Sequence, residues 1–297
     1  MRAHQNLTCG LALAALLLPS LALTSAAGPL PADCKVGDFV IGCQAYTFNR
    51  FSVFEAIEKT SQAGGKTIEF FPGQKLSPEE PNVKFDHNSS DEVIQKVKDQ
   101  LAKYHIRPVN YGVVGARGDA EWRKIFEFAK KLDLYGITTE SVGDLDTIEK
   151  LVKEFDIKVG IHEHGRRPND DSYKVWDPNY VLSVVKDRDP RIGACADTGH
   201  WATSGIIPLD AIKLLKGRII SLHLKERPVI GKQMPDMVYG EGVSNIKGIL
   251  DELKRQGFDG HISIEYENNW DHSVPDVAAC IGFVRGYSAA SSQKRVD

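Results

Sequence analysis

Carboxylates and imidazoles recur at the ends of short apolar runs in this 297-residue chain. Glu140, Asp197 and Glu265 each end such a run, and histidines stand at or near the ends of others. Carboxylates buried side by side repel one another unless a positive charge compensates them. Three carboxylates and an imidazole are natural ligands for Mn²⁺, Mg²⁺, Co²⁺ or Zn²⁺. The pattern therefore predicts a site for one divalent metal ion.

The elements that must position these groups alternate regularly along the chain. Short apolar runs typical of strands are separated by helical patterns such as Trp122, Ile125 and Phe126. Eight such units in about 260 residues predict a single (β/α)8 barrel domain over residues 28–297. A doubly wound open sheet is the alternative, but Gln44–Phe48 is not the Gly-rich phosphate turn that it needs. The predicted strands are Phe39–Phe48, Lys66–Phe71, Ile106–Gly112, Ile137–Ser141, Lys158–His164, Ile192–Asp197, Ile219–Lys225 and His261–Glu267.

In such a barrel the catalytic groups come from the carboxyl ends of the strands. Because side chains alternate between the two faces of a strand, His223 and Lys225 share a face, and so do Glu265 and Glu267. A single histidine or glutamate at a strand end is usually an ordinary packed or solvated residue, so the prediction rests on the whole set. We expect these polar residues to converge on one pocket: Gln44, Tyr46, Glu69, Glu140, His162, His164, Asp197, His200, His223, Lys225, Glu265 and Glu267.

The first 27 residues have the pattern of a secretory signal peptide. A basic start at Arg2 precedes the Leu- and Ala-rich stretch Leu7–Leu23, and Ser25–Ala27 supplies small residues for cleavage near Ala27. A membrane anchor is the alternative, but the apolar stretch is short and Pro19 interrupts it. We therefore expect a secreted or periplasmic protein that has no membrane segment after cleavage.

The net charge disfavours some classes of binding partner, and the positions of the cysteines indicate which disulfide could form. The net charge is −3 with a pI near 6.3 and there is no long basic run, which disfavours nucleic acid and anionic membranes. Cys43 and Cys195 lie in predicted strands, where buried free thiols are common. Cys34 precedes the first strand and Cys280 lies in the last helix, so an oxidising compartment would allow these two to pair.

Four segments together resemble the motif set of xylose-isomerase-like TIM-barrel proteins. They are His162–Gly165 (HEHG), Asp197–His200 (DTGH), His223–Lys225 (HLK) and Ile264–Glu267 (IEYE). That superfamily includes sugar isomerases, ketose 3-epimerases, inosose dehydratases and abasic-site endonucleases. The resemblance runs from about residue 39 to residue 284 and is strongest to secreted members labelled sugar phosphate isomerase/epimerase.

The resemblance implies roles for individual residues. Asp197, His223 and Glu265 match the family's metal ligands. Ketose epimerases have a glutamate where this chain has His162, so Glu140 is the substitute fourth ligand unless His162 itself binds the metal. Glu265 with Glu140 or His162 would move the proton, and Lys225 would offset negative charge. The substrate-binding residues expected are Gln44, Tyr46, Glu69, His164, His200, Trp201, Lys225 and Glu267, with Tyr46, Phe48, Trp201 and Trp270 as candidate stacking faces.

These roles imply a metal-dependent sugar isomerase or epimerase. A metal polarises a carbonyl and stabilises the enediolate that forms when a neighbouring proton is removed. Elimination shares this first step, so a lyase or hydratase acting on keto-sugars such as 3-keto-glycosides is the alternative, and export favours such unphosphorylated substrates. A non-catalytic sugar-binding barrel and a multi-metal phosphodiesterase are weaker hypotheses. Many relatives pair their barrels, and the sequence leaves a homo-oligomer open.

Overall fold

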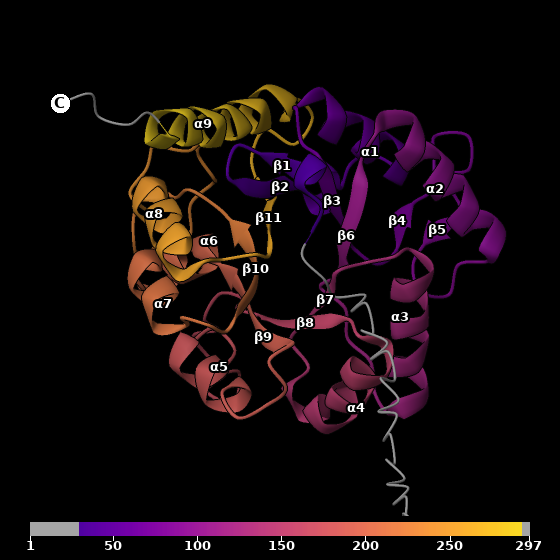
Figure 1. Cartoon of the computed structure of the whole chain (residues 1–297), viewed down its shortest axis with the longest axis horizontal. Helices are drawn as coiled ribbons and strands as arrows, with labels where there is room; N and C mark the ends of the chain where they lie inside the picture. Colours follow the sequence, from indigo (N-terminus) through magenta and orange to yellow (C-terminus); the bar gives the residue numbers. More distant parts are fainter. Residues whose placement is uncertain (1–29, 293–297) are drawn as a thin grey trace, which may run out of the picture.

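Eight parallel strands close into a ring in the computed structural model, which describes residues 30–292 (Figure 1). Strand β2 pairs with both β3 and β11, and this double pairing closes the barrel. The predicted (β/α)8 architecture is confirmed, while the predicted signal peptide lies outside the described residues. The ring strands are β2 (Phe39–Gln44), β3 (Thr67–Phe70), β6 (Arg107–Tyr111), β7 (Gly136–Thr139), β8 (Lys158–His162), β9 (Ile192–Asp197), β10 (Ile219–Leu224) and β11 (His261–Ile264).

Several strands end earlier than the apolar runs that predict them. Strand β2 stops at Gln44, whose side-chain oxygen accepts a hydrogen bond from the backbone N–H of Tyr46 and caps the 3-10 helix η2 (Ala45–Phe48). Strand β11 stops at Ile264, so Glu265 and Glu267 follow the strand instead of lying within it. These polar residues therefore stand on the rim at the carboxyl end of the ring.

Amphipathic helices surround the ring because each has one apolar face to bury against the strands (Figure 1). Helix α3 buries Trp122, Ile125 and Phe126, as the helical spacing predicts. No helix within residues 30–292 is long and apolar enough to cross a membrane. The helices are α1 (Val53–Gln62), α2 (Asp91–Tyr104), α3 (Asp119–Lys131), α4 (Leu145–Phe155), α5 (Pro178–Val185), α6 (Thr198–Thr203), α7 (Pro208–Leu214), α8 (Ile246–Gln256) and α9 (Val274–Ser292).

A short hairpin covers the amino-terminal end of the ring. The 3-10 helix η1 (Ala32–Cys34) leads into β1 (Lys35–Val36), which pairs antiparallel with β2. Cys34 packs there in a small apolar cluster with Val40 and Val109, whereas Cys280 belongs to the main core. All four cysteines of the described chain are buried and free, so Cys34 and Cys280 do not pair.

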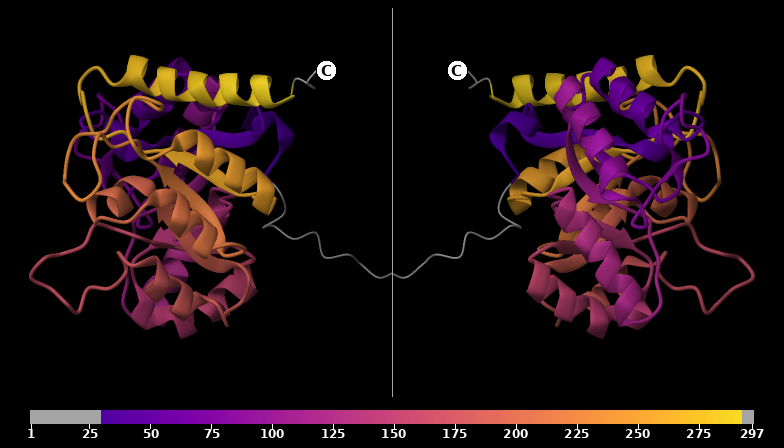
Figure 2. Two further views of the ribbon diagram at one scale, coloured as in Figure 1. Left: turned by 90° about the vertical axis from the view of Figure 1, so that its left-hand side faces the viewer. Right: turned by 90° about the vertical axis from the view of Figure 1, so that its right-hand side faces the viewer.

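Long connections extend from the carboxyl end of the ring. Residues 163–177 join β8 to α5, residues 225–245 join β10 to α8, and both extend on the same side of the molecule (Figure 2). The other long connection, Pro72–Ser90, contains a small ribbon of β4 (Gln74–Lys75) and β5 (Lys84–Phe85). The loops therefore build walls above the strand ends.

Close packing of neighbouring strands requires a glycine at position 42. A Cβ atom added to Gly42 of β2 would lie 1.7 Å from the carbonyl oxygen of Thr67 in β3. We predict that Gly42→Ala lowers the free energy of unfolding by about 3 kcal/mol, because the strand backbones cannot separate without losing hydrogen bonds. Urea denaturation followed by circular dichroism measures this change.

The matched control is Gly282→Ala in α9, where nothing lies within 4 Å of an added Cβ. Alanine favours a helix by about 0.8–1.0 kcal/mol over glycine, so this variant should be as stable as the parent protein or more stable. An equal denaturation midpoint for Gly42→Ala and the parent would contradict the packing argument.

Candidate active site

Four consecutive strands of the ring bring four ligand-type side chains together. His162 ends β8, Asp197 ends β9, His223 lies in β10 and Glu265 follows β11. One side-chain atom from each lies within 4.8 Å of the others, and all four residues are buried. We call these four residues the His/Asp/Glu cluster. Such a mixed nitrogen and oxygen set could hold a divalent metal ion.

The atoms that face the centre of the cluster have no hydrogen-bond partner. His162 Nε2, Asp197 Oδ2 and His223 Nδ1 are buried and make no hydrogen bond, although Lys225 Nζ lies 3.3 Å from Asp197 Oδ2. Asp197 Oδ2 lies 3.5 Å from His162 Nε2 and 3.7 Å from His223 Nδ1. Buried polar atoms are nearly always satisfied in folded proteins, so convergent lone pairs need an explanation. A cation bound between them would satisfy all three, and the residues present therefore fit a metal.

A carboxylate contacts each imidazole at the ring nitrogen that faces away from the centre of the cluster. His223 Nε2 lies 3.1 Å from Glu69 Oε2, and His162 Nδ1 lies 3.2 Å from Glu140 Oε1. An ionised carboxylate accepts the N–H of the ring nitrogen that it faces, which leaves the other nitrogen available to a metal. Metal-binding histidines commonly have this arrangement, which fixes both the tautomer and the orientation of the ring.

Glu69 lies inside the barrel, next to the cluster. It is fully buried and accepts hydrogen bonds from Asn110 Nδ2, Thr138 Oγ1 and Ser263 Oγ at 2.9, 3.1 and 2.8 Å. Burial alone would raise the pKa of Glu69, but the charge and hydrogen bond of His223 outweigh it and lower the pKa. Glu69 lines neither of the cavities described below, and its contact with His223 suits a role in orienting that ring; the expected contact with substrate stays a prediction.

Lys225 is buried among the carboxylates. Its Nζ lies 2.6 Å from Glu265 Oε2, 2.6 Å from Glu267 Oε1 and 3.3 Å from Asp197 Oδ2. Burial would lower the pKa of Lys225, but these carboxylates outweigh it and raise the pKa well above its usual value. The ammonium group therefore neutralises these three carboxylates directly and does not line either cavity.

The surrounding charges determine the protonation of the cluster. Burial would raise the pKa of Asp197 and of Glu265, but neighbouring histidines and Lys225 hold both pKa values well below the usual range. Burial would lower the pKa of His162, but the adjacent carboxylates of Asp197 and Glu140 raise it to about 9. Burial dominates at His200 and keeps its pKa well below the usual value. The two acids are therefore ionised and His200 is neutral.

A cavity of about 390 Å³ opens above the His/Asp/Glu cluster, and we call it the inner cavity. Tyr46 forms one wall, with its ring edge-on to Phe71 and Trp270 at centroid distances of 5.3 and 6.1 Å. Phe48 and Trp201 are fully buried in the core and offer no face to a ligand, contrary to expectation. The lining residues are Gln44, Tyr46, Phe71, Pro72, Val113, Glu140, His162, His164, His200, Glu265 and Glu267.

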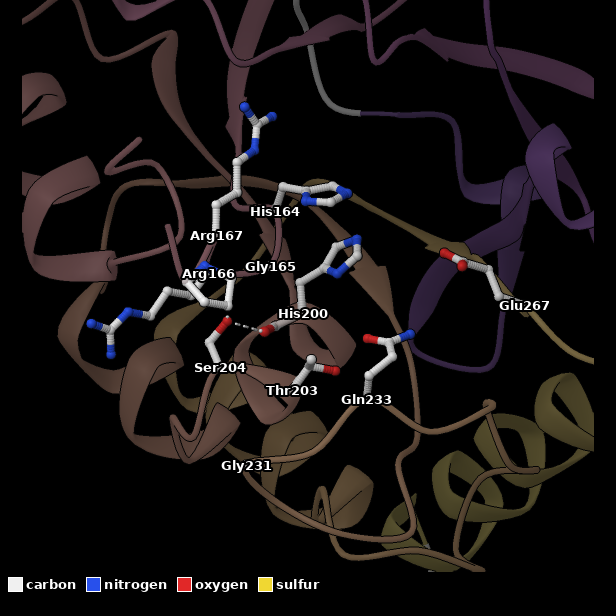
Figure 3. Close-up of a pocket in the computed structure, with 11 residues that line it drawn as sticks. His164, Gly165, Arg166, Arg167, His200, Thr203, Ser204, Gly231, Gln233 and Glu267 are labelled. Atoms are coloured by element: carbon white, nitrogen blue, oxygen red, sulfur yellow. Dashed lines mark hydrogen bonds between the residues drawn. The ribbon is translucent and has the colours of Figure 1, made fainter. Parts of the chain in front are cut away.

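A second cavity of about 930 Å³ lies beside the first (Figure 3), and we call it the outer cavity. Three predicted residues, His164, His200 and Glu267, line both cavities and therefore form the boundary between them. The rings of His164 and His200 lie 4.0 Å apart. The other lining residues are Gly165 of the HEHG segment and seven that the sequence pattern does not single out: Arg166, Arg167, Pro168, Thr203, Ser204, Gly231 and Gln233.

Glu140 lies behind His162 and is not one of the four converging residues. Its Oε1 faces His162, and its Oε2 accepts a hydrogen bond of 2.8 Å from the hydroxyl of Tyr173. Arg167 lies 4.0 Å from the same oxygen and stacks on the Tyr173 ring. Of the two candidates for a fourth ligand, His162 occupies the cluster while Glu140 supports it and lines the inner cavity.

Comparison with known proteins places this geometry in a family. A family model described as xylose isomerase-like TIM barrel matches residues 57–284. The uncharacterized protein MJ1311 of Methanocaldococcus jannaschii is 30% identical over 134 residues, and the match spans 44% of each chain. The chain therefore spans less than half of the length of that relative.

Solved structures share the architecture over most of their length. An uncharacterized protein from Parabacteroides distasonis ATCC 8503 is 32% identical, with a TM-score of 0.68 over 84% of this chain and 99% of that chain. A D-tagatose 3-epimerase-like protein is 20% identical, with a TM-score of 0.65 over 84% of this chain and 97% of that chain, which shows a shared fold. The chain therefore belongs to the xylose isomerase-like TIM barrel family.

Proposed function

We propose that this protein is a divalent-metal-dependent sugar isomerase or epimerase that moves a proton on the carbon next to a carbonyl group. The observation that carries the proposal is the His/Asp/Glu cluster, whose unpartnered atoms converge beneath a cavity with two further glutamates on its lining. A structural core alone has no need for such a costly collection of buried charges. A D-tagatose 3-epimerase-like protein with the same fold is consistent with this assignment.

His162, Asp197, His223 and Glu265 would hold the metal. When bound there, a divalent cation polarises a substrate carbonyl and so makes the neighbouring C–H bond more acidic. Two imidazoles with two carboxylates favour Mn²⁺, Co²⁺ or Zn²⁺ over Mg²⁺, which prefers an all-oxygen set.

Two glutamates are placed to carry the proton. Glu265 and Glu140 both line the inner cavity, and burial raises the pKa of each, but their neighbours lower both values below the usual range. An ionised carboxylate can remove a proton from the carbon next to a carbonyl and return it. Tyr173 and His162 hold both oxygens of Glu140, which fixes its direction. We therefore assign removal and return of the proton to this pair.

Neutral groups orient the sugar in the inner cavity. His200 is neutral and can exchange hydrogen bonds with a hydroxyl or carbonyl oxygen without adding charge. The apolar wall of Tyr46, Phe71 and Pro72 provides a surface for the C–H face of a sugar ring.

A lyase acting on keto-glycosides is the second candidate, because the outer cavity adjoins the inner one. A carbonyl at C3 of a sugar acidifies the proton at C2. After that proton is removed, the electron pair can form a C1–C2 double bond while the C1 substituent leaves with the bonding electrons and takes up a proton. The expected export of the protein supports an unphosphorylated substrate of this kind.

The first prediction concerns metal binding by the parent protein and a ligand variant. We expect His223→Ala to reduce Mn²⁺ affinity by more than about 100-fold, because it removes a buried ligand from the centre of the cluster. Electron paramagnetic resonance of free Mn²⁺ measures this loss. His272→Ala, at an exposed histidine outside the cluster, is the control and should bind as the parent does. Equal affinity of the two variants would contradict the ligand assignment.

The support of His223 by Glu69 gives a second prediction. We expect Glu69→Gln to lower Mn²⁺ affinity by about 10- to 100-fold, because the neutral amide no longer holds the His223 ring by an ionic hydrogen bond. Isothermal titration with Mn²⁺ measures the change, and circular dichroism establishes that the variant is folded. A folded Glu69→Gln variant with parental affinity would show that Glu69 does not orient the ligand.

Proton exchange tests the reaction itself. The metal-loaded protein is incubated in D₂O with ketoses, aldoses and 3-keto-glucosides, and deuterium next to the carbonyl is followed by NMR. At Mn²⁺ concentrations that saturate both proteins, we expect Glu140→Gln to slow exchange by about 10²- to 10⁴-fold, because it loses a proton carrier and keeps the four ligands. Retention of the substituent at C1 indicates an isomerase or epimerase, and its release indicates the lyase.

The control for exchange is Glu241→Gln, which changes an exposed glutamate outside both cavities. It should exchange at the parental rate. If no sugar of the panel exchanges deuterium with the metal-loaded parent protein, the proposed function is wrong for these sugars and the sugar-binding barrel becomes the better hypothesis.

A further inference from the structure

The inner and outer cavities form one bipartite site. They share His164, His200 and Glu267, so a ligand that fills the inner cavity reaches the outer one directly at this boundary. The inner cavity of about 390 Å³ is at the small end of the range for ligand sites, and the outer cavity of about 930 Å³ is near the large end. A single sugar ring above the cluster would leave the larger space unused.

The outer cavity offers neutral hydrogen-bonding groups. Figure 3 shows Thr203, Gln233 and Glu267 directed toward a common space beside His200. The Thr203 hydroxyl oxygen is buried, which leaves the Gln233 amide as the exposed neutral group. The Gln233 amide both donates and accepts hydrogen bonds, as sugar hydroxyls do. Groups of this kind suit the hydroxyls of a carbohydrate.

The two arginines of the outer cavity are engaged elsewhere. Arg167 stacks on Tyr173 at 3.7 Å and lies near Glu140 and Asp170, while Arg166 stacks on Trp176 at 5.0 Å. In Figure 3 both guanidinium groups lie away from Thr203 and Gln233. The arrangement favours a neutral ligand over a phosphorylated one.

We infer that the substrate has two units, with the reacting sugar ring in the inner cavity and a second neutral sugar unit in the outer cavity. This inference rests on the proposed function, because it takes the ring above the His/Asp/Glu cluster to be the reacting one. It assigns Gln233 to recognition of the second unit, with the linkage between the units next to His164 and His200.

Matched pairs of glycosides test this inference on the full-length protein loaded with Mn²⁺. The probes are methyl β-cellobioside with methyl β-glucoside, and methyl α-maltoside with methyl α-glucoside, none of which has the carbonyl that the reaction needs. We expect at least one disaccharide to bind about tenfold more tightly than its single-ring partner, since the second ring adds hydrogen bonds. Proton NMR should show stronger paramagnetic broadening in one ring than in the other, because only one lies beside the metal.

Substitution in the outer cavity separates the two units. Gln233→Ala should reduce disaccharide affinity about tenfold and leave the affinity for the single-ring glycoside unchanged. Gln62→Ala, at an exposed glutamine of α1, is the matched control and should change neither affinity.

The possible failures have different meanings. If single-ring and two-ring glycosides bind equally, if both rings broaden equally, or if Gln233→Ala affects both probes alike, the inference of a second unit is overturned and the proposed function stands. If neither kind of glycoside binds to the Mn²⁺-loaded protein or is broadened by it, the inference of a second unit is overturned, and deuterium exchange with the carbonyl sugars decides the proposed function separately.

Discussion

Compensation of buried negative charge is the constraint on which the rest of the site depends. Five carboxylates gather at the carboxyl end of one barrel: Glu69, Glu140, Asp197, Glu265 and Glu267. Lys225 offsets three of them, and His223 and His162 each join a supporting carboxylate to the cluster. Each charged group therefore holds its neighbour in place. Removing one charge leaves another unpaired in the protein interior, where an unpaired charge strongly destabilises the fold.

The alternation of side chains along the strands predicts the fold and most of the cluster. It does not predict how deep inside the barrel each polar side chain lies. Register places His223 beside Asp197 and Ser263, so Glu265 stands two residues above Ser263. Glu69 also faces inward, yet the tilt of barrel strands leaves it beneath the rim instead of on it. His162 likewise joins the cluster, while Glu140 lies on the far side of its ring and faces Nδ1. Asn110 and Thr138 are polar residues within otherwise apolar strands. Their presence in the sequence indicates buried hydrogen-bond partners for Glu69.

Loop residues could not be predicted, because tertiary contacts alone fix their positions. Tyr173 lies in the long connection after β8 and reaches Glu140 only because that loop folds back over the rim. Gln233 belongs to the connection after β10, where Arg227 pairs with Asp236 at 3.2 Å. Asp236 in turn accepts the backbone N–H of Glu267, which ties this loop to the boundary of the two cavities.

The strands and the loops thus contribute different parts of the site: the strand ends form the cluster, and the loops form most of the outer cavity. In the proposed function, the strand ends place the four metal ligands and the two glutamates that carry the proton, which are the groups needed for the first step shared by isomerisation, epimerisation and elimination. The outcome after that step depends on what stands beside the reacting carbon. A hydroxyl that stays attached allows the proton to return, whereas a substituent held in the outer cavity is positioned to leave. Because the loops after β8 and β10 form most of that cavity, variation in these two loops can change the reaction without altering the cluster.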